Sequence, residues 1–410
     1  MREQSTKSID IQLSEANQII STKKEHLSAV LQISGALTQN LSLHDLFAIY
    51  QDILINQLKI DKILFYVSQN SEWNCLCHYN TDPNNYDIQS YYDYKIAPKS
   101  GSSSLLKDFE AYFSIKLNNQ SLAFVFLGGI NNDVVESKNE RLEFIKSLTY
   151  LMMSSIENKR LIQEEIAKIY YEREISNATV AQMMLLPIDA FETQKLKAYF
   201  NYIPHKDIGG DYYDIFEIKD NKYVFCMCDV AGKGISAGLI MSNFQATFRI
   251  YASQDLPIKD LITILNEKAY ITTKGEKQIT LILGYIDLNE STIEYINAGH
   301  NPAFLLKKDE LIELAVGSTF IGMFDELFSI KSEKLTINSG DVLFTYTDGL
   351  TDIVNNEGQE FTVELLKQYV IDNKDKEVIT FINDLHSYVY SYKNDMPYPD
   401  DISSMFIRIK

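Results

Sequence analysis

The chain has 410 residues, of which 45% are hydrophobic and 23% charged, and its formal net charge is −18. This length exceeds one ordinary single-core domain, and the apolar content is that of a globular protein. Because nucleic-acid backbones are bound by an excess of Lys and Arg, the acidic balance argues against a nucleic-acid partner.

The amino terminus is polar and charged. The longest nearly uninterrupted apolar run, residues 122–130, is far shorter than the ~20 residues of a membrane-spanning helix. We therefore expect an unprocessed cytoplasmic protein with no membrane partner. The four cysteines form two C-x-C pairs, Cys75/Cys77 and Cys226/Cys228, without the C-x2-C spacing of a zinc site. Each pair is predicted to place both thiols on one face of a strand and to pack in a core.

Residues 1–40 are predicted to form a helix with a coiled-coil-like repeat of seven. Two lines of apolar side chains carry the repeat, Leu13, Ile20 and Leu27 on one and Ala16, Val30 and Leu37 on the other. Lys23 interrupts the second line. Pairing with another helix and packing onto the following domain are both open.

Residues 41–150 are predicted to form an α/β unit. A helix at 43–58 precedes strands at 62–68, 73–79, 113–117 and 122–127, and a long loop near 80–104 interrupts them. This order resembles a GAF domain, which implies a sensor for a small-molecule or protein ligand. Tyr91, Tyr92 and Tyr94 in the loop are candidates to line a ligand pocket, with ordinary surface or partial core as the alternative.

The closing helix of this unit is predicted to continue from residue 137 to 186, because the segment contains no Pro or Gly and Pro187 ends it. Three isoleucines at i, i+4 and i+7 give it an amphipathic stripe: Ile162, Ile166 and Ile169. Such a helix would be ~75 Å long. We expect residues 151–186 to connect sensor and effector and to pair in a homodimer. The alternative is two helices broken near Asn158 or Ser176.

Residues 187–410 are β-rich, and short acidic motifs stand at the ends of their strand-like runs. The motifs are G-G-D-Y-Y-D at 209–214, D-V-A-G-K-G at 229–234, Y-T-D-G-L-T-D at 346–352 and D-D-I-S at 400–403. Each alone is typical of a turn. Together they bring carboxylates that would repel one another in a cleft, which points to bound divalent cations. Oxygen-only ligands favour Mg²⁺ or Mn²⁺ over zinc.

These motifs, with N-A-G-H-N-P at 297–302, resemble the metal-dependent protein phosphatase (PPM) family, in its bacterial SpoIIE/RsbU-like branch, over about residues 190–410. The resemblance implies an α+β fold in which a β-sandwich is flanked by helices and holds two or more Mn²⁺ or Mg²⁺ ions. It implies that Asp229 bridges two ions. It further implies that Asp211 and the Val230 carbonyl serve one ion, and that Asp348 and either Asp400 or Asp401 serve the other. Asp352 and Asp214 are left for a third ion or for supporting contacts.

The resemblance also implies the activity, with Asp229, Asp211 and Asp348 as catalytic residues. Water activated between two ions would hydrolyse phosphoserine or phosphothreonine on a partner protein, typically an anti-sigma-factor antagonist. No cysteine is followed by Arg six positions later, as thiol phosphatases require, and no arginine lies inside the motifs to bind the phosphate. Lys233 is either a cation for the site or a surface residue, and His300 either holds a turn or carries a proton. The alternatives are a catalytically inactive phosphoprotein-binding or scaffold module, and metal-assisted hydrolysis of a small nucleotide.

Overall fold

The computed structural model describes residues 2–39, 41–69, 72–86, 88, 108–117, 120–130, 136–187, 190–205, 207–308 and 310–410. The chain divides into two compact units, Met1–Ile169 and Tyr170–Lys410. Each has a hydrophobic core of its own. The loop tyrosines Tyr91, Tyr92 and Tyr94 lie outside the described residues.

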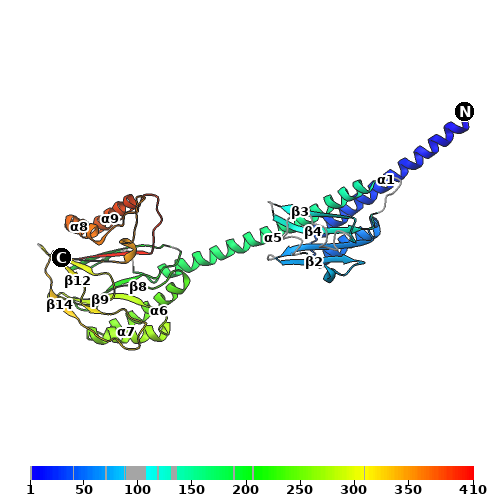
Figure 1. Ribbon diagram of the computed structural model, residues 1–410. Helices are drawn as coiled ribbons and strands as arrows, with labels where there is room; N and C mark the ends of the chain where they lie inside the picture. Colours follow the sequence, from blue (N-terminus) through cyan, green and yellow to red (C-terminus); the bar gives the residue numbers. More distant parts are fainter. Residues whose placement is uncertain are drawn as a thin grey trace. The chain divides into compact units, whose positions relative to one another are not determined.

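The first unit contains a four-stranded antiparallel sheet in the order β2-β1-β4-β3. The strands are β1 (Lys62–Gln69), β2 (Glu72–Tyr79), β3 (Ala111–Leu117) and β4 (Gln120–Gly128). Helices α1 (Arg2–Thr38), α2 (Leu43–Asp52) and the beginning of α5 pack on one face of this sheet (Figure 1). A π-helical turn, Ile53–Gln57, extends α2. All four predicted strands and the entry helix are confirmed, whereas the GAF resemblance stays a prediction.

The two thiols of the first C-x-C pair lie on opposite faces of the sheet. Cys77 packs in the core beneath the helices, while Cys75 belongs to a smaller aromatic cluster on the other face. The pairing of β1 with β2 shifts between Phe65 and Tyr66, so β2 carries one extra residue there, which reverses the alternation of side chains. The prediction of a shared face is wrong for this pair. The second pair behaves as expected, because both thiols are fully buried in one core.

The two apolar lines of α1 have different surroundings. Leu13, Ile20 and Leu27 are each more than half exposed. Val30 and Leu37 instead pack against the core of the first unit. Val30 and Leu37 therefore serve packing onto the following domain, whereas Ala16 and the first line are exposed, and helical pairing along them stays a prediction.

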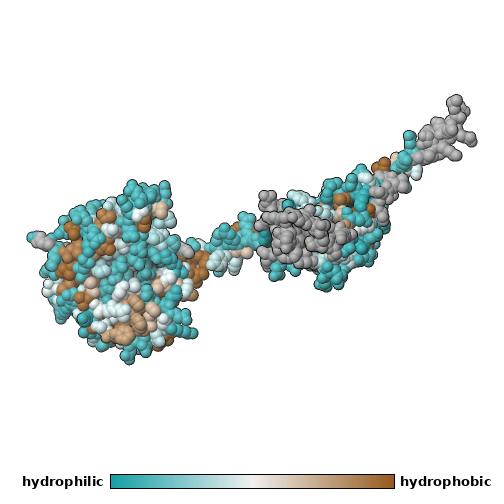
Figure 2. Space-filling view, in the orientation of Figure 1, coloured by the Kyte–Doolittle hydropathy of each residue, from teal (hydrophilic) through white to brown (hydrophobic). Residues whose placement is uncertain are grey.

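Helix α5 (Lys138–Met183) runs without a break, which confirms the single long helix and excludes an interruption near Asn158 or Ser176. Its three stripe isoleucines are exposed, and Figure 2 shows apolar residues among hydrophilic ones on the visible surface. Homodimer formation through this stripe stays a prediction. No described helix is long and apolar enough to cross a membrane.

The second unit is a sandwich of two six-stranded sheets between two pairs of helices (Figure 1). The first sheet has the order β13-β10-β9-β8-β7, with β14 paired to β10, and the second has the order β12-β11-β15-β16-β6-β5. Helices α6 (Ile235–Ala252) and α7 (Ile258–Thr273) pack on the first sheet. Helices α8 (Val363–Asn373) and α9 (Val378–Lys393) pack on the second. The expected sandwich flanked by helices is confirmed.

The strands of the first sheet are β7 (Tyr212–Lys219), β8 (Lys222–Val230), β9 (Ile279–Asp287), β10 (Thr292–Ala298), β13 (Gly317–Ser318) and β14 (Glu333–Thr336). Those of the second are β5 (Ala190–Glu192), β6 (Leu196–Ile203), β11 (Ala303–Leu306), β12 (Leu311–Leu314), β15 (Val342–Tyr346) and β16 (Ile402–Ile409). Strand β8 reads as a continuous apolar run because it lies inside its sheet, with both faces covered. It leaves the core only at its end, where the acidic motifs gather.

Candidate metal centre

Four separate chain segments bring their aspartates to one edge of the sandwich. Asp211 precedes β7, and Asp229 lies near the end of the neighbouring β8. In the second sheet Asp348 follows β15, and Asp400 precedes the adjacent β16. Because these strands are antiparallel neighbours, the end of one meets the start of the next.

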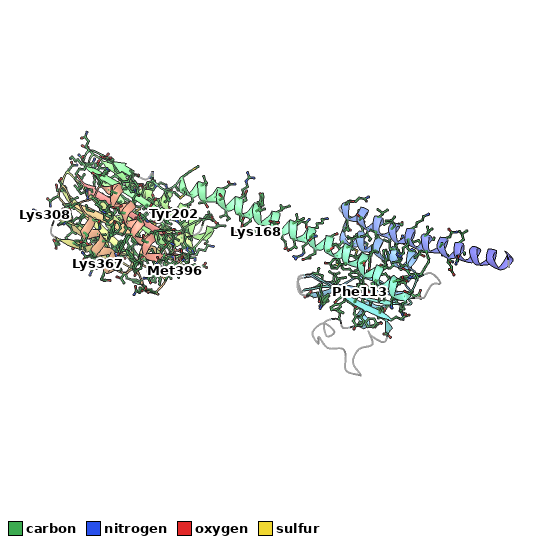
Figure 3. All side chains as sticks on the ribbon, turned by 90° about the horizontal axis from the view of Figure 1, so that it is seen from above. Phe113, Lys168, Tyr202, Lys308, Lys367 and Met396 are labelled. Carbon is green, nitrogen blue, oxygen red and sulfur yellow. The ribbon has the colours of Figure 1, made fainter. Side chains whose placement is uncertain are left out.

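The paired glycines before Asp211 are required by close contacts. A Cβ atom on Gly209 would stand 2.0 Å from the Tyr202 hydroxyl oxygen, and one on Gly210 would stand 2.7 Å from the Val230 carbonyl oxygen. No side chain fits at either position. The two glycines thus allow a close backbone approach, which places the Val230 carbonyl beside the loop that carries Asp211. Tyr202 is labelled in Figure 3.

Asp211 is buried and held by two hydroxyl groups. Its Oδ2 accepts hydrogen bonds from Thr347 Oγ1 at 2.9 Å and from Ser403 Oγ at 2.7 Å. Burial, and then the Asp229 carboxylate, raise the pKa of Asp211 well above its ordinary value, and the Ser403 bond opposes the rise. Both hydroxyl residues stand inside quoted motifs, Y-T-D-G and D-D-I-S, but only the fold shows that they reach Asp211.

Asp229 lies among carboxylates. Burial, and then Asp348, Asp400 and Asp401, raise its pKa to about 7, while a hydrogen bond with Asp211 opposes the rise. A carboxyl group with this pKa is substantially protonated at neutral pH. Burial and its acidic neighbours therefore make the charged form of Asp229 costly.

Asp348 and Asp352 extend the cluster on the side of the second sheet. Burial, and then Asp352 and Asp400, raise the pKa of Asp348. Burial and Asp400 also raise the pKa of Asp352, and Lys233 opposes that rise. The side chain of Asp352 is exposed, so it lies at the outer rim of the cluster.

The two adjacent aspartates of D-D-I-S have different partners. Asp401 is buried, and its two oxygens accept backbone N–H bonds from His205 and Gly210, each at 2.8 Å. Asp400 is part exposed, and its Oδ2 lies 2.9 Å from Lys233 Nζ. Asp401 thus organises the loop before Asp211, which leaves Asp400 as the better candidate ligand of the two.

Asp214 does not join the cluster. Its fully buried carboxylate accepts hydrogen bonds from Arg249 Nε at 2.7 Å and from Arg249 Nη2 at 3.0 Å. The Tyr212 hydroxyl donates a further bond to Asp214. The structure thus gives Asp214 a cationic partner from α6 in place of a role in the cluster.

The donor set fits divalent cations. Among the described residues, no three His, Cys, Asp or Glu side chains are arranged closely enough to hold a metal ion as they stand. However, burial and mutual repulsion raise the pKa of several of these carboxylates, and in the described part of the chain only Lys233 pairs with any of them. Carboxylate and carbonyl oxygens are the ligands of Mg²⁺ and Mn²⁺, and a bound cation would remove the repulsion that keeps the carboxylates apart.

His300 lies behind the cluster and holds a turn. Its backbone N–H donates to Asn297 Oδ1 at 2.8 Å, and its ring Nδ1 lies 2.9 Å from Thr280 Oγ1. Burial lowers its pKa to about 4, so the imidazole is neutral at physiological pH. These contacts favour the turn-holding interpretation over the proton carrier.

The last turn of α5 reaches the loop before Asp211. Gln182 is buried; its Nε2 donates to the Gly209 carbonyl at 2.7 Å, and its Oε1 accepts from the Gly209 N–H at 3.2 Å. A Cβ atom on Gly238 of α6 would stand 3.0 Å from the same Nε2. Gln182 therefore holds this loop against α6. No sequence motif predicted this contact.

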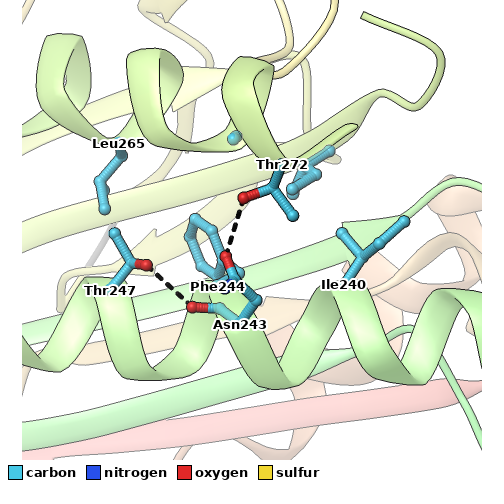
Figure 4. A pocket seen from close by; sticks show the side chains of 8 residues that line it. Ile240, Asn243, Phe244, Thr247, Leu265 and Thr272 are labelled. Carbon is cyan, nitrogen blue, oxygen red and sulfur yellow. Dashed lines mark hydrogen bonds between the residues drawn. The ribbon is translucent and has the colours of Figure 1, made fainter. Parts of the chain in front are cut away.

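A separate small hollow lies between α6 and α7 (Figure 4). Thr272 Oγ1 donates to Asn243 Oδ1 at 3.0 Å across it. Its lining contains no charged side chain: Ile240, Asn243, Phe244, Thr247, Leu265, Ala269, Thr272 and Ile279. It therefore offers no metal ligand and no partner for a phosphate.

Residues 219–410 match the family model described as Stage II sporulation protein E (SpoIIE). The matched segment contains Asp229, Asp348, Asp400 and Asp401, whereas Asp211 precedes it. Protein IcfG of Synechocystis sp. is 30% identical over 224 residues, which cover 47% of this chain and 35% of that protein. Phosphoserine phosphatase RsbP of Bacillus subtilis is 29% identical over 192 residues, which cover 45% of this chain and 47% of that protein.

The chain thus spans less than half the length of each of these two relatives. Among solved structures, the SiaA-PP2C domain of Pseudomonas aeruginosa covers 60% of this chain and 99% of its own, with a TM-score of 0.52 and 16% identity. The second unit accordingly has the PP2C fold and matches a SpoIIE-type domain.

Proposed function

We propose that the chain is a signalling phosphatase that hydrolyses phosphoserine or phosphothreonine on a partner protein, its second unit being a SpoIIE-type, metal-dependent serine/threonine phosphatase domain. The observation that carries the proposal is the crowding of carboxylates around Asp229, which raises its pKa to about 7. A structural cluster would be stabilised by cationic side chains, whereas a metal site needs its carboxylates free.

We assign the ligands residue by residue. Asp211 and the Val230 carbonyl would hold one ion, Asp348 and Asp400 the other, and Asp229 both. Two divalent ions held there would supply an activated water and neutralise charge on the phosphoryl group. The protein's own residues position the donors: Thr347 and Ser403 hold one oxygen of Asp211, and Asp211 interacts with Asp229.

The test is an assay of the full chain on a phosphoserine peptide and on p-nitrophenyl phosphate, with Mn²⁺, with Mg²⁺ and with EDTA. Asp229→Asn is the matched variant, because it keeps the size of the side chain and removes its charge. We expect hydrolysis that needs the metal and is lost in the variant. Metal-independent hydrolysis, or full activity of Asp229→Asn, would overturn the two-metal assignment.

We further propose that the first unit acts as the sensor and that α5 transmits its state. The contact of Gln182 with Gly209 supports this, since a displacement of the end of α5 would move the loop before Asp211. The expected arrangement is a homodimer paired along Ile162, Ile166 and Ile169, and the expected substrate a phosphorylated anti-sigma-factor antagonist. Gln182→Ala should change Mn²⁺ affinity measured by calorimetry; an unchanged affinity would remove Gln182 from the transmission.

A further inference from the structure

The proposed reaction places a phosphate dianion beside a cluster of aspartates, and no arginine stands in the motifs to receive it. Metal ions offset part of the repulsion, but phosphate-binding sites in proteins commonly add a cationic side chain. A lysine outside every motif, Lys277, lies beside the turn that follows Asp229.

Lys277 lies just before β9, next to the turn that follows Asp229. The Ala231 N–H donates to the Gln278 carbonyl at 2.9 Å, and Val230 is paired with Ile279, so the backbone before β9 is fixed beside that turn. The Lys277 ammonium stands 2.8 Å from the point that a Cβ atom on Gly232 would occupy. The glycine therefore leaves room for the lysine.

No carboxylate in the described parts of the chain forms an ion pair with Lys277, and its side chain is only partly exposed. Other lysines of this unit are paired, for example Lys219 and Lys222 with Asp255. A partly buried ammonium without a counter-ion attracts an anion from solution.

Lys233 contributes a second cation from the same turn. Its Nζ lies 2.9 Å from Asp400 Oδ2 and donates to the Pro399 carbonyl at 2.7 Å. A cation bound by Asp400 would compete with this ion pair and release the ammonium. The turn from Asp229 to Gly234 thus carries two candidate metal ligands and one lysine, and a second lysine lies beside it.

We propose that Lys277, assisted by Lys233, binds the phosphoryl oxygens of the phosphoserine or phosphothreonine substrate. The proposal deepens the proposed function and rests on it. The ions would bind the phosphate from the carboxylate side, and Lys277 would donate charge-assisted hydrogen bonds from the side of the Gly232 turn. Lys277 is then a substrate-binding residue that leaves metal affinity unchanged.

The test compares full-length Lys277→Met, which keeps the length of the side chain, with Lys277→Arg, which keeps the charge. Lys259→Met on the exposed beginning of α7 is the control for net charge. With Mn²⁺ present, one measures KM and kcat for a phosphoserine peptide, inhibition by inorganic phosphate, and direct binding of a fluorescent phosphopeptide. Mn²⁺ affinity and thermal unfolding are measured on the same samples.

We expect Lys277→Met to raise KM and the phosphate inhibition constant at least about 10-fold, since a hydrogen bond to a charged group is lost. Lys277→Arg should stay within a few-fold of the parent, and Lys259→Met should match it.

Parent-like values for Lys277→Met, or an equal rise in Lys259→Met, would overturn the proposal while the phosphatase assignment stands. Phosphopeptide binding without turnover in the parent would overturn the proposed function alone. A parent that neither binds nor hydrolyses the peptide would overturn both.

Discussion

Asp211 and Asp214 stand three residues apart, both buried, in opposite electrostatic surroundings. Asp214 accepts two hydrogen bonds from Arg249 and one from Tyr212. Asp211 accepts bonds from two neutral hydroxyls, and burial together with the Asp229 carboxylate raises its pKa.

The difference shows how to distinguish a structural carboxylate, which has a cationic partner within the protein, from a candidate metal ligand such as Asp211, which has none among the described residues. A buried charge is tolerated when a cation and hydrogen bonds satisfy it within the protein. Asp214 meets this condition without any addition. Asp211 does not, and on the proposed assignment a cation from solution would stabilise its charged form. Four experiments test this contrast.

The largest effect is expected when Asp214 loses its partner. Arg249→Ala leaves a fully buried carboxylate without a cation, and we expect the free energy of unfolding to fall by about 3–5 kcal/mol. Urea denaturation of the metal-free protein measures it. The double variant with Asp214→Asn should recover part of the loss. A change under about 1 kcal/mol would contradict the structural role given to this pair.

Removing the Asp229 carboxylate should greatly lower activity and leave stability unchanged or higher, the opposite of what we expect for the partner of Asp214. Asp229→Asn should lower phosphatase activity at least about 100-fold, since the loss of even a supporting contact at a metal site costs 10–100-fold. Yet its metal-free unfolding free energy should equal or exceed that of the parent, because one repelling charge is gone. Activity assays and denaturation curves, measured on the parent and on the variant, test both expectations. A variant that is both inactive and strongly destabilised would indicate that Asp229 has a structural role.

A smaller effect is expected from the hydroxyls that hold Asp211. Ser403→Ala should weaken Mn²⁺ binding about 10-fold in calorimetry, because Asp211 loses one of its two hydroxyl donors. Ser404→Ala is the control, since this neighbour is buried but its hydroxyl has no partner among the described residues. Equal affinities for the two variants would show that Ser403 does not position the ligand.

The smallest expected effect is the change of the unfolding free energy per pH unit. The folded pKa of Asp229, about 7, lies above its ordinary value of 3.8, so between these values the folded state binds more protons than the unfolded state. Unfolding free energy of the metal-free protein should therefore fall as pH rises from 4 to 7, and the Asp229 proton alone contributes at most about 1.4 kcal/mol per pH unit to this fall.

Mn²⁺ should reverse this slope, because metal ligands must be deprotonated and binding then strengthens with pH. Denaturation at pH 5, 6, 7 and 8, with and without the ion, measures both slopes. Asp229→Asn should flatten the metal-free curve. A metal-free protein that becomes more stable between pH 5 and 8 would show that the carboxylates do not repel one another as described.

Much of the fold could be predicted from the sequence because periodicity reports local burial. The strands of the first unit, the unbroken α5 and the apolar β8 all follow from patterns of side chains along one segment. The β2 irregularity escaped this reasoning, since the extra residue becomes visible only against the partner strand, and Cys75 was placed on the wrong face.

The sequence by itself determined which aspartates stand at strand ends, because motif, strand and turn are contiguous in the chain. Only the tertiary structure decided which of them share a site. It separated Asp214 from Asp211 by supplying Arg249 from α6, and it distinguished Asp401 from Asp400 by their partners. It also brought Ser403 to Asp211, Gln182 to Gly209 and Lys277 to Gly232 from distant positions in the chain. The physical reason is that a carboxylate's role depends on the charges and donors around it, and these come from other segments.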